Sequence, residues 1–142
     1  MENIRQIQQS IIEEFKSLDG DFEITIEHLM YLGENLEKFP EQYRNNDYIV
    51  KGCQSKVWLH AESKNDEVYL QGDSNTSITK GLLSLLLRVF DGQSPVDILK
   101  ADIYFPSKIG MNRFIGSQRS NGFFSMIKQI KIYALAFSSI EK

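Results

Sequence analysis

The feature that most constrains this chain is the segment from Thr76 to Phe90, whose second half reads LLSLLLRVF. Its apolar side chains cover nearly every side of a helix, whereas a helix at a protein surface keeps one polar face. A helix that is apolar all round must be enclosed by other elements. We therefore expect this segment at the centre of the fold, surrounded by the rest of a 142-residue chain, a length that suits one domain over residues 1–142.

Two amphipathic helices are predicted ahead of this central segment. Residues 3–18 place apolar side chains three and four positions apart, which is the spacing of one helix face. The pair Asp19-Gly20 is a stop signal, and Asp21 is a suitable N-cap for a second helix that reaches about Leu36. Both helices can lay their apolar faces on the central segment.

From about Tyr48 the apolar period changes from helical spacing to two. The segment VWLHAE (57–62) alternates in this way, which predicts a strand with one buried face. Residues 64–66 read as a turn, and residues 68–71 read as the second strand of a hairpin.

The remainder of the chain is predicted as helix, irregular segment and helix. Ser94 and Pro95 suit the N-cap and first position of a short helix. Residues 102–120 are rich in glycine, serine and polar residues and are expected to be irregular, and residues 121–136 carry a helical apolar stripe. This order predicts an α+β fold in which a small antiparallel sheet packs against several helices.

The charge is unevenly distributed. The net charge is −3, which disfavours general nucleic-acid binding. Residues 1–50 carry 11 acidic and 4 basic side chains, and residues 51–142 carry 8 acidic and 12 basic ones; such polarity can orient a partner or can be an ordinary solvated surface. No apolar run is long enough to cross a membrane, and residues 1–5 lack the pattern of a signal peptide, so a cytoplasmic location is expected.

The chain has a single cysteine, Cys53, in the stretch KGCQSKVW (51–58). One cysteine excludes an internal disulfide, and with only two histidines the sequence predicts no metal site. Nearby lysines and Gly52 favour an accessible, reactive thiolate. Strand alternation would instead place Cys53 on the core face with Val57 and Leu59, where free cysteines are common. A third interpretation combines both: the sulfur rests inward and swings out when a partner binds.

The chemistry open to a lone cysteine is limited. A cysteine hydrolase needs a base within hydrogen-bond reach. His60 is seven residues away, about 23 Å along an extended strand, and His28 could approach only through tertiary folding. A redox thiol usually has a second cysteine. A thiol that carries a group between proteins needs no base of its own, so it fits this chain best.

Three blocks, VKGCQSKVWL (50–59), LQGDSNTSITKGLLSLLLRVFDGQSPVDIL (70–99) and SQRSNGFFSMIKQIKIYA (117–134), resemble the signature blocks of the SufE family. The resemblance covers about residues 3–137 in one collinear order. It implies the fold shared by SufE proteins and the iron–sulfur scaffold proteins of the IscU type.

The resemblance also implies a function. Cys53 would accept sulfane sulfur from a pyridoxal-phosphate-dependent cysteine desulfurase (SufS-like), stimulate that enzyme and pass the sulfur to a cluster-assembly scaffold (SufB-like). The chain would need no cofactor or metal of its own and would act as a monomer or homodimer, without nucleic acid or membrane. Supporting positions would be Gly52, Gln54, Ser55, Asp73 and Arg119.

Several points stay open at this stage. Asp73 either caps the central helix or hydrogen-bonds the cysteine loop and governs its opening. Arg119 either contacts the desulfurase or supports the thiolate electrostatically, or it is a surface or helix-start arginine. Phe114 and Ser117 stand in the segment where many family members have His and Pro, so an imidazole there has no required role. The alternative to the sulfur carrier is a regulatory or scaffold module that binds the desulfurase without carrying sulfur.

Overall fold

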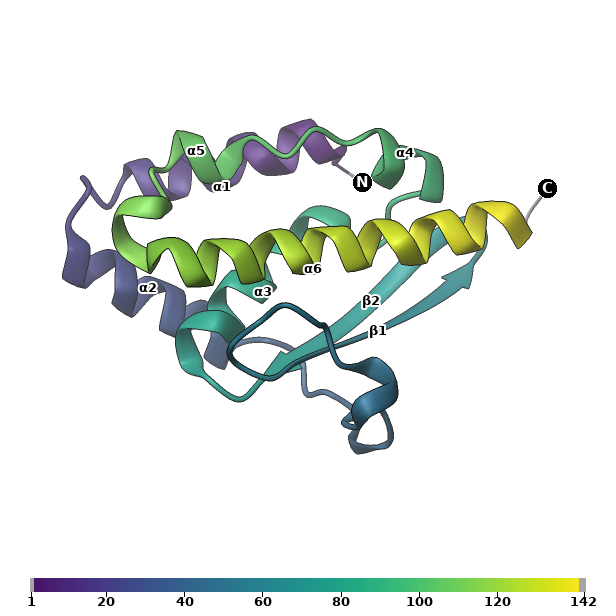
Figure 1. The fold of residues 1–142 in the computed structure, drawn as a ribbon. Helices are drawn as coiled ribbons and strands as arrows, with labels where there is room; N and C mark the ends of the chain where they lie inside the picture. Colours follow the sequence, from purple (N-terminus) through teal and green to yellow (C-terminus); the bar gives the residue numbers. More distant parts are fainter. Residues whose placement is uncertain (1, 141–142) are drawn as a thin grey trace.

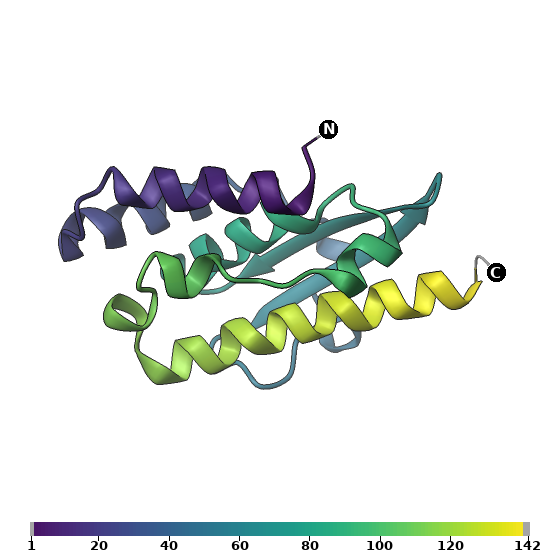
Figure 2. The ribbon, with the colours of Figure 1, turned by 90° about the horizontal axis from the view of Figure 1, so that it is seen from above.

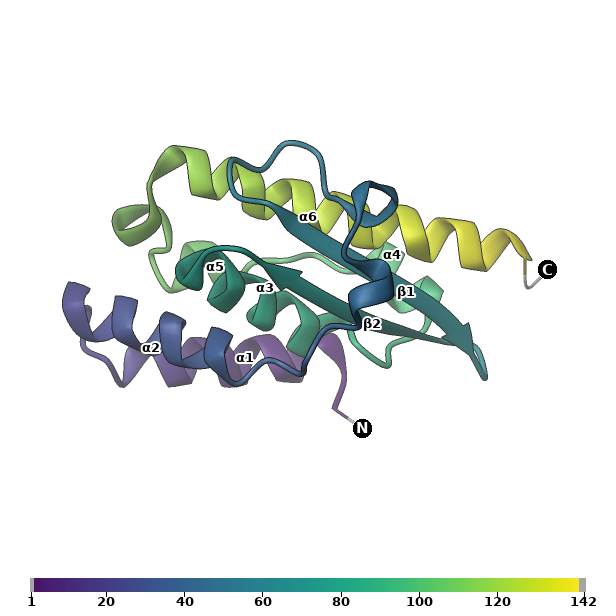
Figure 3. The same ribbon diagram turned by 90° about the horizontal axis from the view of Figure 1, so that it is seen from below.

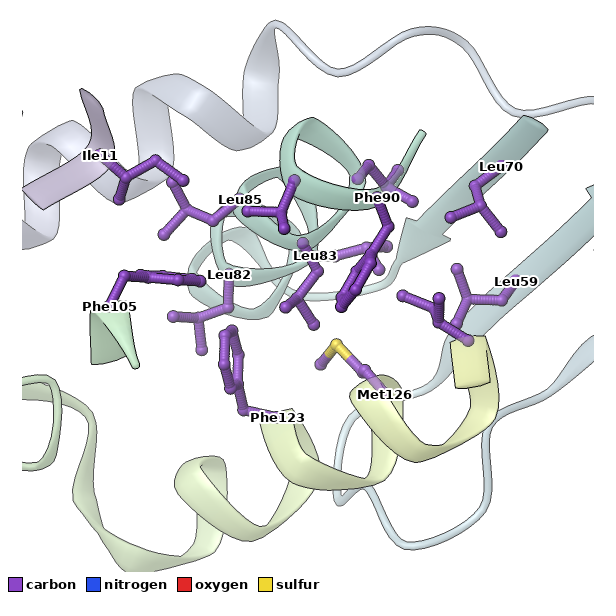
Figure 4. Packing of buried hydrophobic residues seen from close by; sticks show 14 of the residues in the cluster. Ile11, Leu59, Leu70, Leu82, Leu83, Leu85, Phe90, Phe105, Phe123 and Met126 are labelled. Carbon is purple, nitrogen blue, oxygen red and sulfur yellow. The ribbon is translucent and has the colours of Figure 1, made fainter. Parts of the chain in front are cut away.

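The central position predicted for the leucine-rich helix is confirmed in the computed structural model, which describes residues 2–140. Helix α3 (Ser77–Phe90) contacts α1 (Ile4–Lys16), α2 (Phe22–Glu34), α6 (Asn112–Ile140) and strand β2 (Glu67–Ser74). Leu82, Leu83, Leu85 and Leu86 are fully buried. Figure 4 shows Leu82, Leu83 and Leu85 among side chains from α1, α6 and the sheet. Burial of each such leucine contributes about 1.5–3 kcal/mol to folding.

The sheet is an antiparallel hairpin of β1 (Val57–Lys64) and β2, so the α+β prediction is confirmed. Asn65 and Asp66 both have positive φ, as the two central residues of a type I′ turn require. Pairing runs from Lys64↔Glu67 at the turn to Val57↔Ser74 at the far end. The hairpin thus brings the residues before β1 beside those that lead from β2 into α3.

The expectation of one buried face on β1 is wrong at the start of the strand. Residues 57–60 are all buried, because the short helices η1 (Glu41–Tyr43) and η2 (Asn46–Tyr48) cover the outer face. The ring of Tyr43 stacks on His60 with centroids 3.6 Å apart. Figure 3 shows this segment lying across the hairpin. Alternation could not reveal this cover, which comes from another part of the chain.

The two N-terminal helices end near their predicted boundaries. Asp21 caps α2 by accepting a hydrogen bond from the backbone N–H of Ile24 at 2.9 Å. Helix α2 crosses α3 very closely at Gly81, where a Cβ on the glycine would lie inside van der Waals contact of the Leu29 carbonyl. Figure 2 shows α1 and α6 on opposite sides of α3.

The expectation that residues 102–120 are irregular is wrong. They contain α5 (Phe105–Lys108) and the first turns of α6, which is interrupted by the non-helical backbone of Gly116 (φ 80°, ψ 168°). The buried side chain of Gln8 organises the entry to α5: it donates to the Asp102 carbonyl and accepts from the N–H groups of Tyr104 and Phe105. The short helix from Pro95 to Lys100 (α4), capped by Ser94, was predicted correctly.

No helix within residues 2–140 is both long and apolar enough to span a bilayer. The elements form an elongated body in which α6 runs along one side and the hairpin lies against it (Figure 1). The loop that precedes β1 lies beside α6 in both Figure 1 and Figure 3. This places the cysteine segment at the junction of sheet and C-terminal helix.

Candidate functional site

The loop of residues 51–56 is closed at its base by several hydrogen bonds. Val50 N–H donates to the Val57 carbonyl at 2.8 Å. Lys56 N–H donates to Asn75 Oδ1 at 3.0 Å, and the Lys56 carbonyl accepts from Ser74 Oγ at 2.8 Å and from Asn75 N–H at 3.2 Å. The base of the loop is therefore anchored to the junction between β2 and α3.

The tip of the loop, in contrast, rests on α6 through close packing. Gly52 has φ +96°, a conformation that other residues adopt only with strain, and a side-chain carbon there would lie 2.5 Å from Ser125 Oγ. The Cys53 thiol points the same way and donates to the Gly122 carbonyl with Sγ and O 3.4 Å apart. Gly52 thus allows the loop to turn its cysteine against α6.

The sulfur of Cys53 is half-buried and packs against the hydrophobic core. Burial raises the pKa of the thiol, because removal of water disfavours the thiolate. The neutral thiol is therefore the resting form, and it is this form that donates to Gly122. The inward orientation does not come from strand alternation, since β1 begins only at Val57. It comes from the turn at Gly52.

A hollow of about 90 Å³ adjoins the sulfur and collects most of the predicted site residues. Its wall combines polar side chains from the loop and α6 with apolar side chains from α3 and α6; it consists of Cys53, Gln54, Ser55, Thr79, Leu82, Gln118, Arg119, Gly122 and Met126. The Ser55 hydroxyl is fixed by Thr76 Oγ1 at 2.8 Å and by Thr79 Oγ1 at 3.3 Å. The structure thus brings Arg119 to the cysteine from a segment 66 residues away in sequence.

Asp73 lies outside this hollow and fulfils neither of its two predicted roles directly. The N-cap of α3 is Thr76, and the carboxylate of Asp73 pairs with Arg44, with Lys80 Nζ at 3.3 Å and with Ser74 N–H at 2.8 Å. Burial by itself raises the pKa of this carboxyl, but the hydrogen bonds from Arg44 and Ser74 and the charge of Lys80 outweigh burial, so the pKa lies below its ordinary value. Through its pair with Arg44, Asp73 connects the η1–η2 segment, which covers β1, to the base of the cysteine loop.

Arg44 was not anticipated as part of this arrangement. Its guanidinium also bonds Glu41 at 3.0 Å and lies over the rings of Phe39 and Trp58, 5.5 and 5.3 Å from their centroids. Nothing in the local sequence marks Arg44, because its partner Asp73 lies 29 residues later. Thr76 and Thr79 are one helical turn apart in the sequence. This spacing indicates that their hydroxyl groups lie on the same side of the helix start, where both contact Ser55.

Both histidines are held away from the cysteine by other partners. His28 Nε2 bonds Glu14 Oε2 at 2.7 Å between α1 and α2, and His60 is stacked under Tyr43. Neither histidine lines the hollow at Cys53. Of the residues that the structure describes, those that line this hollow include no imidazole or carboxylate that could act as the general base of a cysteine hydrolase. Residues 2–140 contain no cluster of three or more His, Cys, Asp or Glu side chains that could hold a metal ion.

The arrangement is suited to a nucleophile that exchanges a small group with a visiting partner. The thiol is sheltered, its loop is anchored at the base, and a cation and hydrogen-bond donors stand beside the hollow. Thiol exchange depends on thiolate fraction and access, both of which change when such a loop moves outward.

Comparisons with known proteins identify the family of this chain. The model of the SufE family, described as an Fe-S metabolism associated domain, matches residues 9–134. The chain is 36% identical over 126 residues to an uncharacterized SufE-like protein of Rhizobium meliloti, covering 85% of this chain and 89% of that protein. It is 32% identical over 111 residues to an uncharacterized SufE-like protein of Synechocystis, covering 78% and 70%.

A longer relative and a solved structure are also similar to this chain. SufE-like protein 1, chloroplastic/mitochondrial, of Arabidopsis thaliana is 31% identical over 129 residues, which are 89% of this chain but 34% of that longer protein. The solution structure of a hypothetical protein from Thermus thermophilus has the same fold, with a TM-score of 0.75, 20% identity and coverage of 92% and 94%. The family model and the relatives above 30% identity together show that this chain belongs to the SufE family.

Proposed function

We propose that this protein is a sulfur carrier that accepts sulfane sulfur on Cys53. Membership of the SufE family associates the chain with sulfur transfer and with a cysteine desulfurase in general. The observation that carries the proposal is the placement of the only cysteine at the tip of a base-anchored loop, with its sulfur beside a hollow of about 90 Å³. A water molecule occupies about 30 Å³ of liquid, so this hollow has room for one added sulfur atom.

The proposed transfer is an exchange between a thiol and a persulfide. The Cys53 thiolate attacks the terminal sulfur of a persulfide on the donor, forming a new S–S bond as the donor S–S bond breaks. The electron pair of the broken bond leaves with the donor cysteine as a thiolate, which takes up a proton. No external oxidant or reductant is needed, because the sulfane sulfur keeps its oxidation state throughout.

The residues around Cys53 have distinct proposed roles. Arg119 would stabilise the negative charge of the thiolate and of the persulfide, because a guanidinium always carries its charge. Gln54 and Gln118 can donate hydrogen bonds to the terminal sulfur, and Ser55 fixes the base of the loop through Thr76. Gly52 permits the turn that shelters the sulfur. Asp73 supports the base of the loop through the neighbouring Ser74, whose hydroxyl donates to the Lys56 carbonyl.

The proposed donor is a pyridoxal-phosphate-dependent desulfurase of the SufS kind, and the proposed acceptor is a scaffold of the SufB kind. In the resting loop the pKa of Cys53 is raised, so uptake of sulfur requires the loop to turn outward or the partner to supply a positive environment. A loop that shelters the persulfide again after loading would protect it from small thiols in a reducing cytoplasm.

The test is intact-mass spectrometry of the protein after incubation with a cysteine desulfurase, cysteine and pyridoxal phosphate. Wild type should gain one or more sulfur atoms that a thiol reductant removes, and Cys53→Ser should gain none. Arg119→Gln should load more slowly while keeping the same product. If Cys53→Ser stimulates the desulfurase as well as wild type does, the carrier role is wrong and the chain acts as a binding module.

A further inference from the structure

A hollow that the proposed sulfur transfer does not use lies between the α1–α2 turn, α5 and the start of α6, which Figure 1 and Figure 3 show at one end of the molecule. Its volume is about 610 Å³, several times that of the hollow at Cys53 and typical of sites for small organic molecules. Its apolar lining consists of Ile12, Phe15, Phe22, Ile109 and Phe114. Phe22 is 59% exposed, so an occupant would cover an aromatic ring that now faces water.

The charged part of the lining is mainly cationic. Lys16, Lys108 and Arg113 line the hollow together with one carboxylate, that of Asp19. Within residues 2–140 none of the three cations lies within ion-pair distance of a carboxylate. A negative group that enters the hollow therefore has no internal ion pair to displace.

Arg113 is held in place by the corner between α5 and α6. Its backbone N–H donates to the Gly110 carbonyl at 3.0 Å. Its guanidinium packs on the same glycine, because a Cβ on Gly110, whose φ is +68°, would lie 2.6 Å from Arg113 Nη2. A guanidinium can bind both oxygens of a carboxylate. One that already rests on the backbone loses less side-chain entropy when it does so.

Thr25 places a hydroxyl group in the same hollow. The residue is 5% exposed, and no hydrogen bond joins its hydroxyl to another group of residues 2–140. In that part of the chain every fully enclosed side-chain nitrogen or oxygen has a partner, so the Thr25 hydroxyl opens into the hollow. Buried hydroxyls generally have a hydrogen-bond partner. An occupant with an acceptor group would supply the missing one.

We infer that this hollow binds a small carboxylate with an apolar body, such as a fatty acid. The carboxylate lies on Arg113 and Lys108 and accepts from the Thr25 hydroxyl, and the hydrocarbon part covers the phenylalanine rings. Burial of that hydrocarbon and of the rings drives binding.

Other small anions fit this lining less well. A nucleotide or a sugar phosphate carries many donors and acceptors, and Thr25 is the one uncharged polar side chain among the described residues that line the hollow. Most polar groups of such a ligand would lose water without gaining a partner. A bare inorganic anion would leave the aromatic rings exposed to water.

The test is isothermal titration calorimetry of the full chain with sodium dodecanoate below its micellar concentration. We expect one site with a Kd below about 1 mM. Butyrate, which has the carboxylate but a short chain, should bind at least about tenfold more weakly. Dodecyltrimethylammonium, which has the same chain and the opposite charge, should also bind at least about tenfold more weakly.

Variants separate the charged contact from the apolar one. Arg113→Gln and Phe22→Ser should each raise the Kd for dodecanoate about tenfold, and Thr25→Val should raise it about threefold or more. The matched controls are Lys64→Gln, on an exposed cation of the hairpin, and Phe124→Ser, on a ring that is also 59% exposed but lies outside the hollow. Both should bind dodecanoate like wild type. A circular-dichroism melt of each variant shows whether it is folded.

Two further measurements locate the site and its source of ligand. Backbone NMR shifts during the titration should concentrate in residues 12–25 and 108–114. Vesicles of phosphatidylglycerol should not sediment the chain, because the hollow takes a single molecule. Sedimentation with vesicles that Arg113→Gln abolishes would show a membrane-binding surface instead and overturn the inference.

The inference is also overturned if dodecanoate binds more weakly than about 1 mM, if the ammonium compound binds equally well, or if Phe124→Ser weakens binding as much as Phe22→Ser does. It does not rest on the proposed sulfur transfer, because calorimetry reports binding at a hollow that Cys53 does not line.

Discussion

The turn at Gly52 offers the sharpest way to open the cysteine loop without touching the cysteine. In Gly52→Ala the new Cβ would lie 2.5 Å from Ser125 Oγ at a backbone φ of +96°. A non-glycine residue with positive φ costs about 1–2 kcal/mol. That strain acts only on the sheltered loop, since an outward loop can adopt other angles.

The expected consequence is faster reaction of Cys53 with a small reagent. Each 1.4 kcal/mol changes an equilibrium tenfold, so destabilising the sheltered loop by about 1–2 kcal/mol should raise the open fraction roughly 5- to 30-fold. The assay is the rate of alkylation by iodoacetamide near neutral pH, followed by intact mass. The rate should rise in the same proportion while the loop is mainly closed in wild type.

A matched control separates the loop effect from general destabilisation. Gly20 also has positive φ (+69°), but a Cβ there meets nothing within 4 Å and Gly20 is remote from the thiol. Gly20→Ala should lower the unfolding midpoint and leave the alkylation rate unchanged. If Gly52→Ala alkylates no faster than Gly20→Ala, the sheltered loop is not held by the turn at Gly52 and the reasoning fails.

Three further predictions rest on charge and close packing. In the folded protein the pKa of Cys53 is raised by burial, so half-maximal alkylation should occur at a higher pH than in the guanidinium-unfolded chain; an equal or lower midpoint would contradict the sheltered thiol. Because the folded pKa of Asp73 is lowered, its contribution to stability is present above the unfolded pKa of about 3.9 and is lost as pH falls through the folded value. Asp73→Asn should therefore lower the unfolding free energy at pH 7 by about 2 kcal/mol, and urea titrations should show this difference shrinking toward pH 3. Gly81→Ala forces a methyl group against the Leu29 carbonyl and should lower the unfolding free energy by at least about 2 kcal/mol, whereas a wild-type urea midpoint would show that α2 and α3 can separate freely.

Features with a local cause could be predicted from the sequence. The central helix followed from leucines on all its sides, and the hairpin followed from alternation interrupted at Asn65 and Asp66. The cap at Asp21 and the start of α4 at Ser94 depend on residues within one helical turn. In each case the residues that cause the structure are neighbours in the sequence.

Features with a distant cause could not be predicted. The local sequence does not predict helix α5, because the side chain that organises its start, Gln8, lies about 96 residues earlier in the chain. The packing of η1 and η2 over β1 and the Arg44–Asp73 pair also join residues that lie far apart in the sequence. For the site, the family blocks predicted that Cys53, Ser55 and Arg119 belong together, but the sheltered orientation of the sulfur depends on Gly122, a contact visible only in three dimensions.

The bonds of Gln8 also bear on the order in which the chain can fold during synthesis. Its partners on residues 102–105 are 94 to 97 positions later in the sequence. At about 5–20 residues per second, the ribosome completes these partners roughly 5–20 seconds after Gln8 itself. Throughout that interval α1 is an amphipathic helix whose buried residues Ile4, Ile11 and Phe15 await their final packing. Helix α1 is therefore made long before the contacts of Gln8 that fix it in place.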